Sequence, residues 1–269
     1  LLLNFINKYN KELLFILLSL LLFNLNPYQT RFYIASPLII TDLFFILGSI
    51  ISIIGIDDKN KKNFFIGLII SSFARQSSIA ILIAVFAIKV IKKEKFFLST
   101  YNIISSLVIF ILIYFIGLIY TKTGVQDTTH SSIYFSHFFG IFVEDATFKE
   151  YIIFLIWPLL SFGPLIIFII FFIKFNYDSI KNNFNTNIFI FIFSLLIIAQ
   201  PIISGFFMSG KNIIRLSSFS YAPILIFLIM NFKIKKIRNI KIFIFFVFLS
   251  IWTCHPTFSK FEYLERFKF

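Results

Sequence analysis

Two ionisable residues, Asp42 and Arg75, interrupt the long apolar stretches of the chain. A charged side chain within a membrane-spanning helix costs about 2.5–3.5 kcal/mol on insertion scales, so each one needs a partner or a function. Asp42 lies near the head of one apolar run, and Arg75 lies with Gln76 between the next two runs. Two interpretations are open. Either the two charges form an ion pair that pins two helices, or Arg75 forms one wall of an external site for an anion.

Two further polar segments offer chemistry of the same kind. Arg215 and Lys211, beside Asn212, supply a forked and a point-like donor that suit a phosphate group. The ordinary alternative for these residues is snorkelling toward lipid headgroups. Asp127 and His130 pair a carboxylate with an imidazole that can contact a sugar hydroxyl, and the alternative is a solvated loop in which they have no role.

The composition excludes an ordinary water-soluble domain. Of the 269 residues 59% are hydrophobic and 14% are charged, and the mean hydropathy is +0.93, whereas soluble domains are about 45–50% apolar and about 25% charged. The single cysteine, Cys254, and three scattered histidines give no metal-binding pattern. We therefore expect a membrane protein without a metal or a cofactor.

The apolar runs predict an all-α, polytopic membrane bundle of about nine spanning or half-spanning helices. One transmembrane domain covers 1–269, with an external loop at about 121–150, which is long for a structureless connection. The chain begins at Leu1 without a signal peptide, and we expect it to be an N-terminally truncated fragment. The expected helices are 13–25, 36–56, 64–75, 76–91, 101–120, 151–173, 187–208, 220–232 and 242–254.

The distribution of the basic residues indicates how the chain is oriented in the membrane and does not indicate nucleic-acid binding. The net charge is +13, and with the N-terminus inside, sixteen of the 25 Lys and Arg residues fall on inner segments. Lysines on both sides of 64–91 place both of its ends inside, so this segment is predicted to be a hairpin with Arg75 at its tip. The lysine run 233–241 is predicted to fix topology and to bind anionic lipid.

The motifs around these residues resemble a known group of enzymes. Thr41-Asp42 at the head of one helix, followed by Arg75 at a hairpin tip, is similar to the GT-C superfamily of membrane glycosyltransferases. A closer resemblance is to the dolichyl-phosphate-glucose-dependent alpha-1,2-glucosyltransferase family, over about residues 25–230. The residues that carry it are Arg75-Gln76-Ser77-Ser78-Ile79, Gln126-Asp127-Thr128-Thr129-His130, and Asn212 with Arg215. The chain departs from the family where Ser78 replaces an asparagine and where Asn212 and Arg215 are not adjacent.

The resemblance implies a hexosyltransferase that takes a hexose, glucose by the closer likeness, from a polyprenyl- or dolichyl-phosphate carrier. Its acceptor is an external lipid-linked glycan or another external group, and its other partners are membrane lipids and no nucleic acid. Arg75, Arg215 and Lys211 are expected to bind the donor phosphate. The expected supporting or sugar-contacting residues are Asp42, Gln76, Asp127, His130 and Asn212.

The catalytic residue is not assigned. GT-C enzymes place an acidic residue in the first external loop, and the corresponding segment 26–36 contains no carboxylate. We expect an outward-facing site in a bacterial cytoplasmic membrane, or an endoplasmic reticulum location in a eukaryote. Two alternatives remain open at this point: a secondary transporter or lipid flippase gated by Asp42 and Arg75, and a polymerase or ligase of surface polysaccharide.

Overall fold

Every regular element among the residues that the computed structural model describes is a helix. These residues are 2–9, 17, 19–21, 23, 40–92, 97–124, 147–149, 151–152, 155–156, 183–204, 216–231, 241, 244–245 and 248. The elements are α1 (Leu2–Tyr9), α4 (Ile40–Asp57), α5 (Lys61–Ala74), the 3-10 helix η3 (Gln76–Ser78), α6 (Ile79–Lys92), α7 (Thr100–Gly124), α12 (Phe184–Ile203), the 3-10 helix η7 (Ser218–Ser220) and α15 (Tyr221–Asn231). The all-α prediction is confirmed for this part of the chain.

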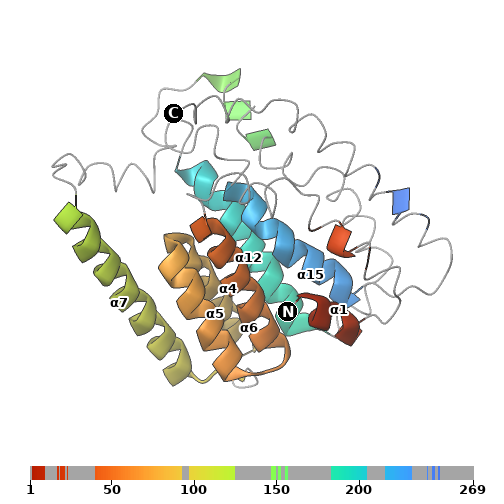
Figure 1. The fold of residues 1–269 in the computed structure, drawn as a ribbon, viewed down its shortest axis with the longest axis horizontal. Helices are drawn as coiled ribbons and strands as arrows, with labels where there is room; N and C mark the ends of the chain where they lie inside the picture. Colours follow the sequence, from red (N-terminus) through yellow and green to blue (C-terminus); the bar gives the residue numbers. More distant parts are fainter. Residues whose placement is uncertain are drawn as a thin grey trace.

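The helices α4, α5, α6, α7, α12 and α15 lie where apolar runs predict them. The break at Arg75 is confirmed, because α5 ends at Ala74, Arg75 is extended, and α6 runs back toward the end from which α5 came (Figure 1). Helix α5 begins three residues before the predicted 64, and α12 begins three before 187. Helix α7 continues to Gly124, so the first residues of the segment 121–150 are helical. The predicted helices 13–25, 151–173 and 242–254 lie largely outside the described residues.

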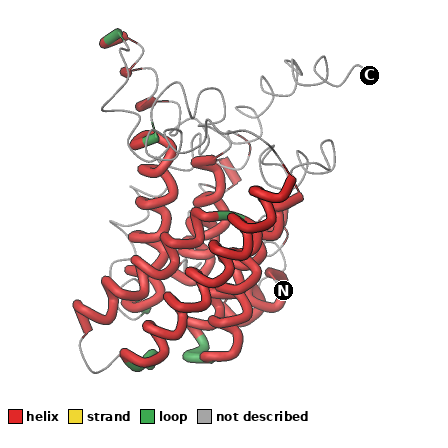
Figure 2. Tube along the Cα trace, turned by 90° about the vertical axis from the view of Figure 1, so that its left-hand side faces the viewer, coloured by secondary structure: helices red, strands yellow, loops and turns green. Residues whose placement is uncertain are grey.

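Two of the described helices, α4 and α12, are long and apolar enough to cross a membrane. Helices α6, α7 and α15 contain shorter apolar stretches. Figure 2 shows the helices lying side by side along a common direction. The prediction of about nine spanning or half-spanning helices stays a prediction.

A tight turn reverses the chain between α4 and α5. Lys59 adopts a left-handed conformation with φ of 54°, and Asn60 then caps α5 by accepting a hydrogen bond from the Asn63 amide at 3.2 Å. A side chain that accepts from the third helical residue satisfies one of the donors left free at a helix start. This cap explains why α5 begins before its apolar run does.

Helices α4 and α5 pack backbone against backbone along their length. A Cβ atom added to Gly67 would lie 2.5 Å from the Ser52 amide nitrogen and 2.6 Å from the Gly48 carbonyl oxygen. A Cβ atom added to Gly48 would lie 2.6 Å from the Ser71 amide nitrogen. Small residues at such positions allow close helix approach, which is a common packing mode of membrane helices.

The core lies where α4, α5, α6, α12 and α15 meet. It is built of large side chains that are almost fully buried, among them Phe45, Phe64, Ile81, Phe193 and Ile226. Phe189 and Phe193 stack on one another along α12 with ring centroids 5.9 Å apart. Helix α7 packs against α5 and α6 at the side of this core (Figure 1).

The substitution Gly67→Ala is expected to destabilise the protein strongly. The new methyl group would meet backbone atoms of α4, which cannot move without shifting the whole helix, and overpacking typically costs about 1–3 kcal/mol or more. Thermal unfolding in detergent, followed by size-exclusion chromatography, measures the effect. Ile69→Ala on the exposed side of α5 is the control and is expected to change little. Equal behaviour of the two variants would contradict this packing.

Candidate functional site

Asp42 and Arg75 form an ion pair at one end of the α4–α5 hairpin. Asp42 lies in the first turn of α4, and Arg75 follows the last residue of α5. Arg75 Nε donates a hydrogen bond to Asp42 Oδ1, and Arg75 Nη2 contacts the same oxygen. The Asp42 side chain is 0% exposed, whereas that of Arg75 is 23% exposed. The ion-pair interpretation is therefore observed, and the carboxylate is its buried member.

An aromatic ring holds one face of the Arg75 guanidinium. Arg75 Cζ lies 5.0 Å from the centroid of the Phe219 ring, a distance at which a guanidinium is attracted to an aromatic face. Phe219 lies in η7 and is itself packed against Phe45 of α4, with ring centroids 5.3 Å apart. Two elements that are far apart in the sequence, α4 and η7, thus fix the orientation of one arginine.

The Nη1 edge of this guanidinium has no hydrogen-bond acceptor among the described residues. Nε and Nη2 meet Asp42, and within the described ranges no residue accepts a hydrogen bond from Nη1. An arginine carries five N–H donors in a planar fork that matches the oxygens of carboxylate and phosphate groups. Gln76, the next residue, is exposed at the start of η3. The arrangement can therefore bind an anion beside Arg75.

The other predicted site residues lie outside the described residues. These are Asp127, His130, Lys211, Asn212 and Arg215. The structure brings together Asp42 and Arg75, with Gln76 adjacent in the chain, and does not test the rest. It does place Phe219, four residues after Arg215 in the sequence, on the Arg75 guanidinium.

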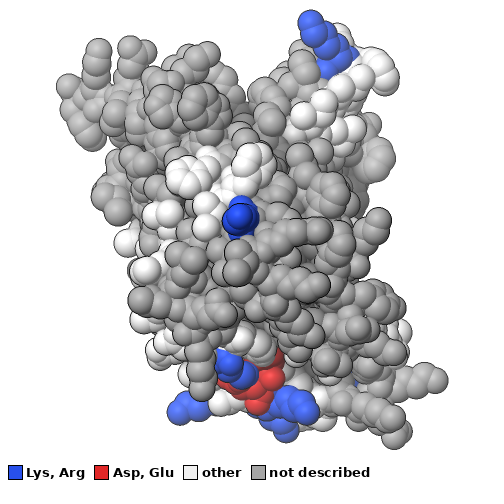
Figure 3. Space-filling view, turned by 90° about the vertical axis from the view of Figure 1, so that its right-hand side faces the viewer, with Lys and Arg blue, Asp and Glu red and all other residues white. Residues whose placement is uncertain are grey.

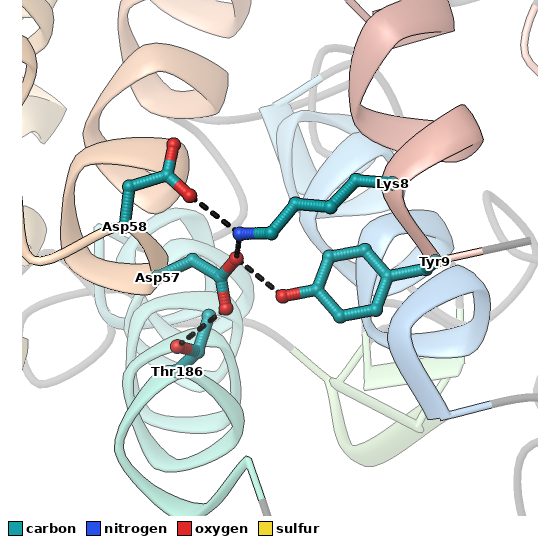
Figure 4. Close-up of polar contacts among 5 residues, drawn as sticks. All are labelled: Lys8, Tyr9, Asp57, Asp58 and Thr186. Atoms are coloured by element: carbon teal, nitrogen blue, oxygen red, sulfur yellow. Dashed lines mark hydrogen bonds and ion pairs between the residues drawn. The ribbon is translucent and has the colours of Figure 1, made fainter.

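A second polar cluster, absent from the sequence predictions as a site, lies at the opposite end of α4 (Figure 4). Lys8 Nζ lies 2.6 Å from Asp57 Oδ2 and also contacts Asp58. Tyr9 donates a hydrogen bond to Asp57, and Thr186 Oγ1 donates to Asp57 Oδ1 at 3.4 Å. Lys8 and Asp57 are 49 residues apart in the chain, so no local pattern signals their contact. The cluster fastens α1 to the ends of α4 and α12.

These contacts shift the pKa of both residues on α1. Partial burial lowers the pKa of Lys8, but the hydrogen bonds and charges of Asp57 and Asp58 outweigh it, so the net pKa is raised above 10.5. Burial raises the pKa of Tyr9 far above 10.0, and the hydrogen bond to Asp57 raises it further. The protonated forms of both side chains are therefore favoured in the folded state.

A buried pair of amides joins α12 to α15 at the same end. Asn187 Nδ2 donates to Asn231 Oδ1 at 3.1 Å, and Asn231 Nδ2 donates to Asn187 Oδ1 at 2.8 Å. Asn231 also donates to the Phe227 carbonyl oxygen at 2.7 Å. Sequence reasoning did not find this pair, because nothing local relates two asparagines 44 residues apart.

Among the described residues, no group of three or more His, Cys, Asp or Glu side chains is placed to hold a metal ion. Comparison of the chain with protein-family models, curated proteins and solved structures found no match. The likeness to GT-C enzymes accordingly depends on the sequence motifs.

Single and double substitutions of the ion pair are expected to differ in a defined way. Arg75→Leu leaves the Asp42 carboxylate buried without its guanidinium, and such a change costs about 3–5 kcal/mol. Asp42→Leu is expected to cost less, because the Arg75 side chain already reaches solvent. The double variant should recover much of the loss, as apolar replacements of buried pairs often do. Chemical unfolding in detergent measures all three, and strictly additive effects would contradict the pairing.

The contact between α1 and Asp57 is expected to weaken at alkaline pH. A raised folded-state pKa contributes stability that is present below the unfolded values of 10.0 for Tyr9 and 10.5 for Lys8 and is lost above them. The Tm difference between wild type and Asp57→Asn should therefore shrink as the pH rises from 9 to beyond about 10.5. Lys62→Met is the control for charge, because Lys62 is exposed and forms no ion pair with any described residue. A Tm difference that stays constant with pH would refute the assignment.

Proposed function

We propose that this chain is part of a multi-pass membrane glycosyltransferase of the GT-C type. It would transfer a hexose, glucose by the closer resemblance, from a polyprenyl- or dolichyl-phosphate carrier to a lipid-linked glycan or another external acceptor. The observation that carries the proposal is the orientation of Arg75. Its guanidinium is fixed by Asp42 and Phe219 on two sides, and among the described residues no acceptor occupies Nη1 on a third.

The chemistry of this donor class suits such an arginine. A polyprenyl-phosphate sugar contains a phosphodiester, and rupture of the bond between the sugar carbon and the phosphate oxygen releases a phosphate monoester with additional negative charge. A guanidinium held in place before the reaction stabilises that developing charge without reorganising. The acceptor hydroxyl attacks the same sugar carbon as its proton passes to a base.

Asp42 is not that base in the proposed mechanism. Its side chain is fully buried, and its Oδ1 oxygen is engaged by Arg75. Its role is to position Arg75, and the base is not assigned to a residue. This division explains why an acidic residue can lie at the site without taking part in proton transfer.

A single arginine paired with a carboxylate carries no net charge, so a second cation is needed to hold the phosphate. Arg215 and Lys211 are the proposed source. Support comes from the chain path, because the segment that follows Arg215 reaches the site through Phe219. Gln76, Asn212, Asp127 and His130 would contact the sugar or the acceptor.

The orientation proposed for the membrane follows from the two ends of the α4–α5 hairpin. Lys59, Lys61 and Lys62 lie at the turn between α4 and α5, and Asp42 and Arg75 lie at the other end. The positive-inside rule assigns the lysine-bearing turn to the cytoplasmic side. The arginine site would then face outward from a bacterial membrane, or into the lumen in a eukaryote.

Hexose transfer by the full-length gene product tests the proposal. The decisive variant is Asp42→Leu/Arg75→Leu, which is expected to fold because it removes both charges together, yet to lose transfer by about 10²–10³-fold. Arg75→Lys, which keeps the charge but loses the fork, should lose about tenfold. Radiolabelled hexose supplied on polyprenyl phosphate measures both, and Lys149→Gln serves as the unaffected control. A folded double variant with full activity would leave Arg75 with a structural role only.

A further inference from the structure

Among the residues whose side chains the structure describes, the end of the bundle that carries the α4–α5 turn has an unbalanced charge. Five such lysines lie on α1, the turn, the start of α5 and the last turns of α6, against two aspartates. Figure 3 shows the acidic atoms of this end flanked by basic ones. The residues are Lys8, Asp57, Asp58, Lys59, Lys61, Lys62 and Lys89.

Of the five lysines, Lys8 is the one that forms ion pairs with the two aspartates. It contacts Asp57 and Asp58 together, and Asp57 is further engaged by Tyr9 and Thr186. Lys59, Lys61, Lys62 and Lys89 form no ion pair with any residue in the described ranges. We call these four residues the lysine collar.

The position of two collar residues, Lys61 and Lys62, is unfavourable for the fold itself. Lys61 and Lys62 occupy the first turn of α5, which contains no acidic residue. The start of a helix carries a partial positive charge, so cations placed there are destabilising unless an anion compensates them. Protein carboxylates do not supply that compensation within the described residues, because Lys8 takes both of the nearby ones.

Exposed apolar side chains lie directly beside the collar. Val90 and Ile91 follow Lys89 in α6 and are 59% and 53% exposed. On α5, Ile66 is 40% exposed, one turn after Lys62. An anionic lipid matches both features, because its headgroup is negatively charged and its acyl chain is apolar. Nucleic acid or a soluble phosphate would match only the positive charge.

We propose that the lysine collar binds the phosphate groups of anionic phospholipids at the face of the membrane where the α4–α5 turn lies. The ammonium groups of Lys59, Lys61, Lys62 and Lys89 contact the headgroups, and the exposed faces of α5 and α6 contact the acyl chains. This inference rests on the membrane location in the proposed function and is independent of hexose transfer. It assigns a lipid partner to an end of the bundle that Arg75 does not reach.

Lipid binding by the purified full-length protein in neutral detergent tests the inference. Phosphatidylglycerol and phosphatidylcholine with the same acyl chains are titrated, and bound lipid is counted by native mass spectrometry. We expect the wild type to prefer phosphatidylglycerol and to lose that preference in high salt. The variant Lys59→Gln/Lys61→Gln/Lys62→Gln/Lys89→Gln should bind phosphatidylglycerol at least tenfold more weakly, since each lysine near an anionic surface adds to affinity.

Matched variants separate this inference from the others. Lys149→Gln should bind phosphatidylglycerol as the wild type does, and so should Asp42→Leu/Arg75→Leu, even if hexose transfer by that double variant is lost. Unchanged binding in the four-lysine variant overturns the proposal, as does equal affinity of the wild type for both lipids. Full competition by millimolar inorganic phosphate also overturns it, because the ligand would then be a free anion rather than a lipid.

Discussion

The close contact between α4 and α5 is the constraint on which the arrangement of charges depends. Gly48 and Gly67 let the two backbones meet, since a Cβ atom at either position would lie within 2.7 Å of backbone atoms of the other helix. Helices in such contact cannot slide past one another by a residue without collision. The register that brings Arg75 to Asp42 is therefore set by glycines in the middle of the hairpin, about two turns away from the ion pair.

This constraint separates the polar chemistry into two ends. In the middle of the hairpin two serine hydroxyls bond to their own helices: Ser49 donates to the Phe45 carbonyl at 2.8 Å and Ser71 to the Gly67 carbonyl at 2.9 Å. Such bonds satisfy a polar group without a partner helix. Ion pairs between elements occur instead at the ends of α4, with Arg75 at one and Lys8 at the other.

The sequence predicts the polar pair at one end of α4 and not the cluster at the other end, and the reason is physical. Asp42 and Arg75 were visible because an isolated charge in an apolar run is costly, and the lysines around 64–91 indicated the hairpin that joins them. Lys8 and Asp57 lie in polar breaks, where charges are common, so nothing marked them as partners. The four-residue spacing of Gly48 with Ser52, and of Gly67 with Ser71, was a usable signal for close helix packing that composition alone concealed.

The unequal burial of the ion pair argues for a ligand rather than for a clamp alone. Apolar side chains of similar volume would join α4 and α5 at least as well as a buried ion pair, because desolvation offsets most of the attraction between the charges. The exposure of the two side chains is also unequal, because the Arg75 side chain is 23% exposed while that of Asp42 is fully buried. The carboxylate thus acts as a fixed support that presents the guanidinium outward, with Phe219 limiting its rotation. An arginine held in this way has lost its conformational freedom before an anion arrives, and binding then costs less entropy.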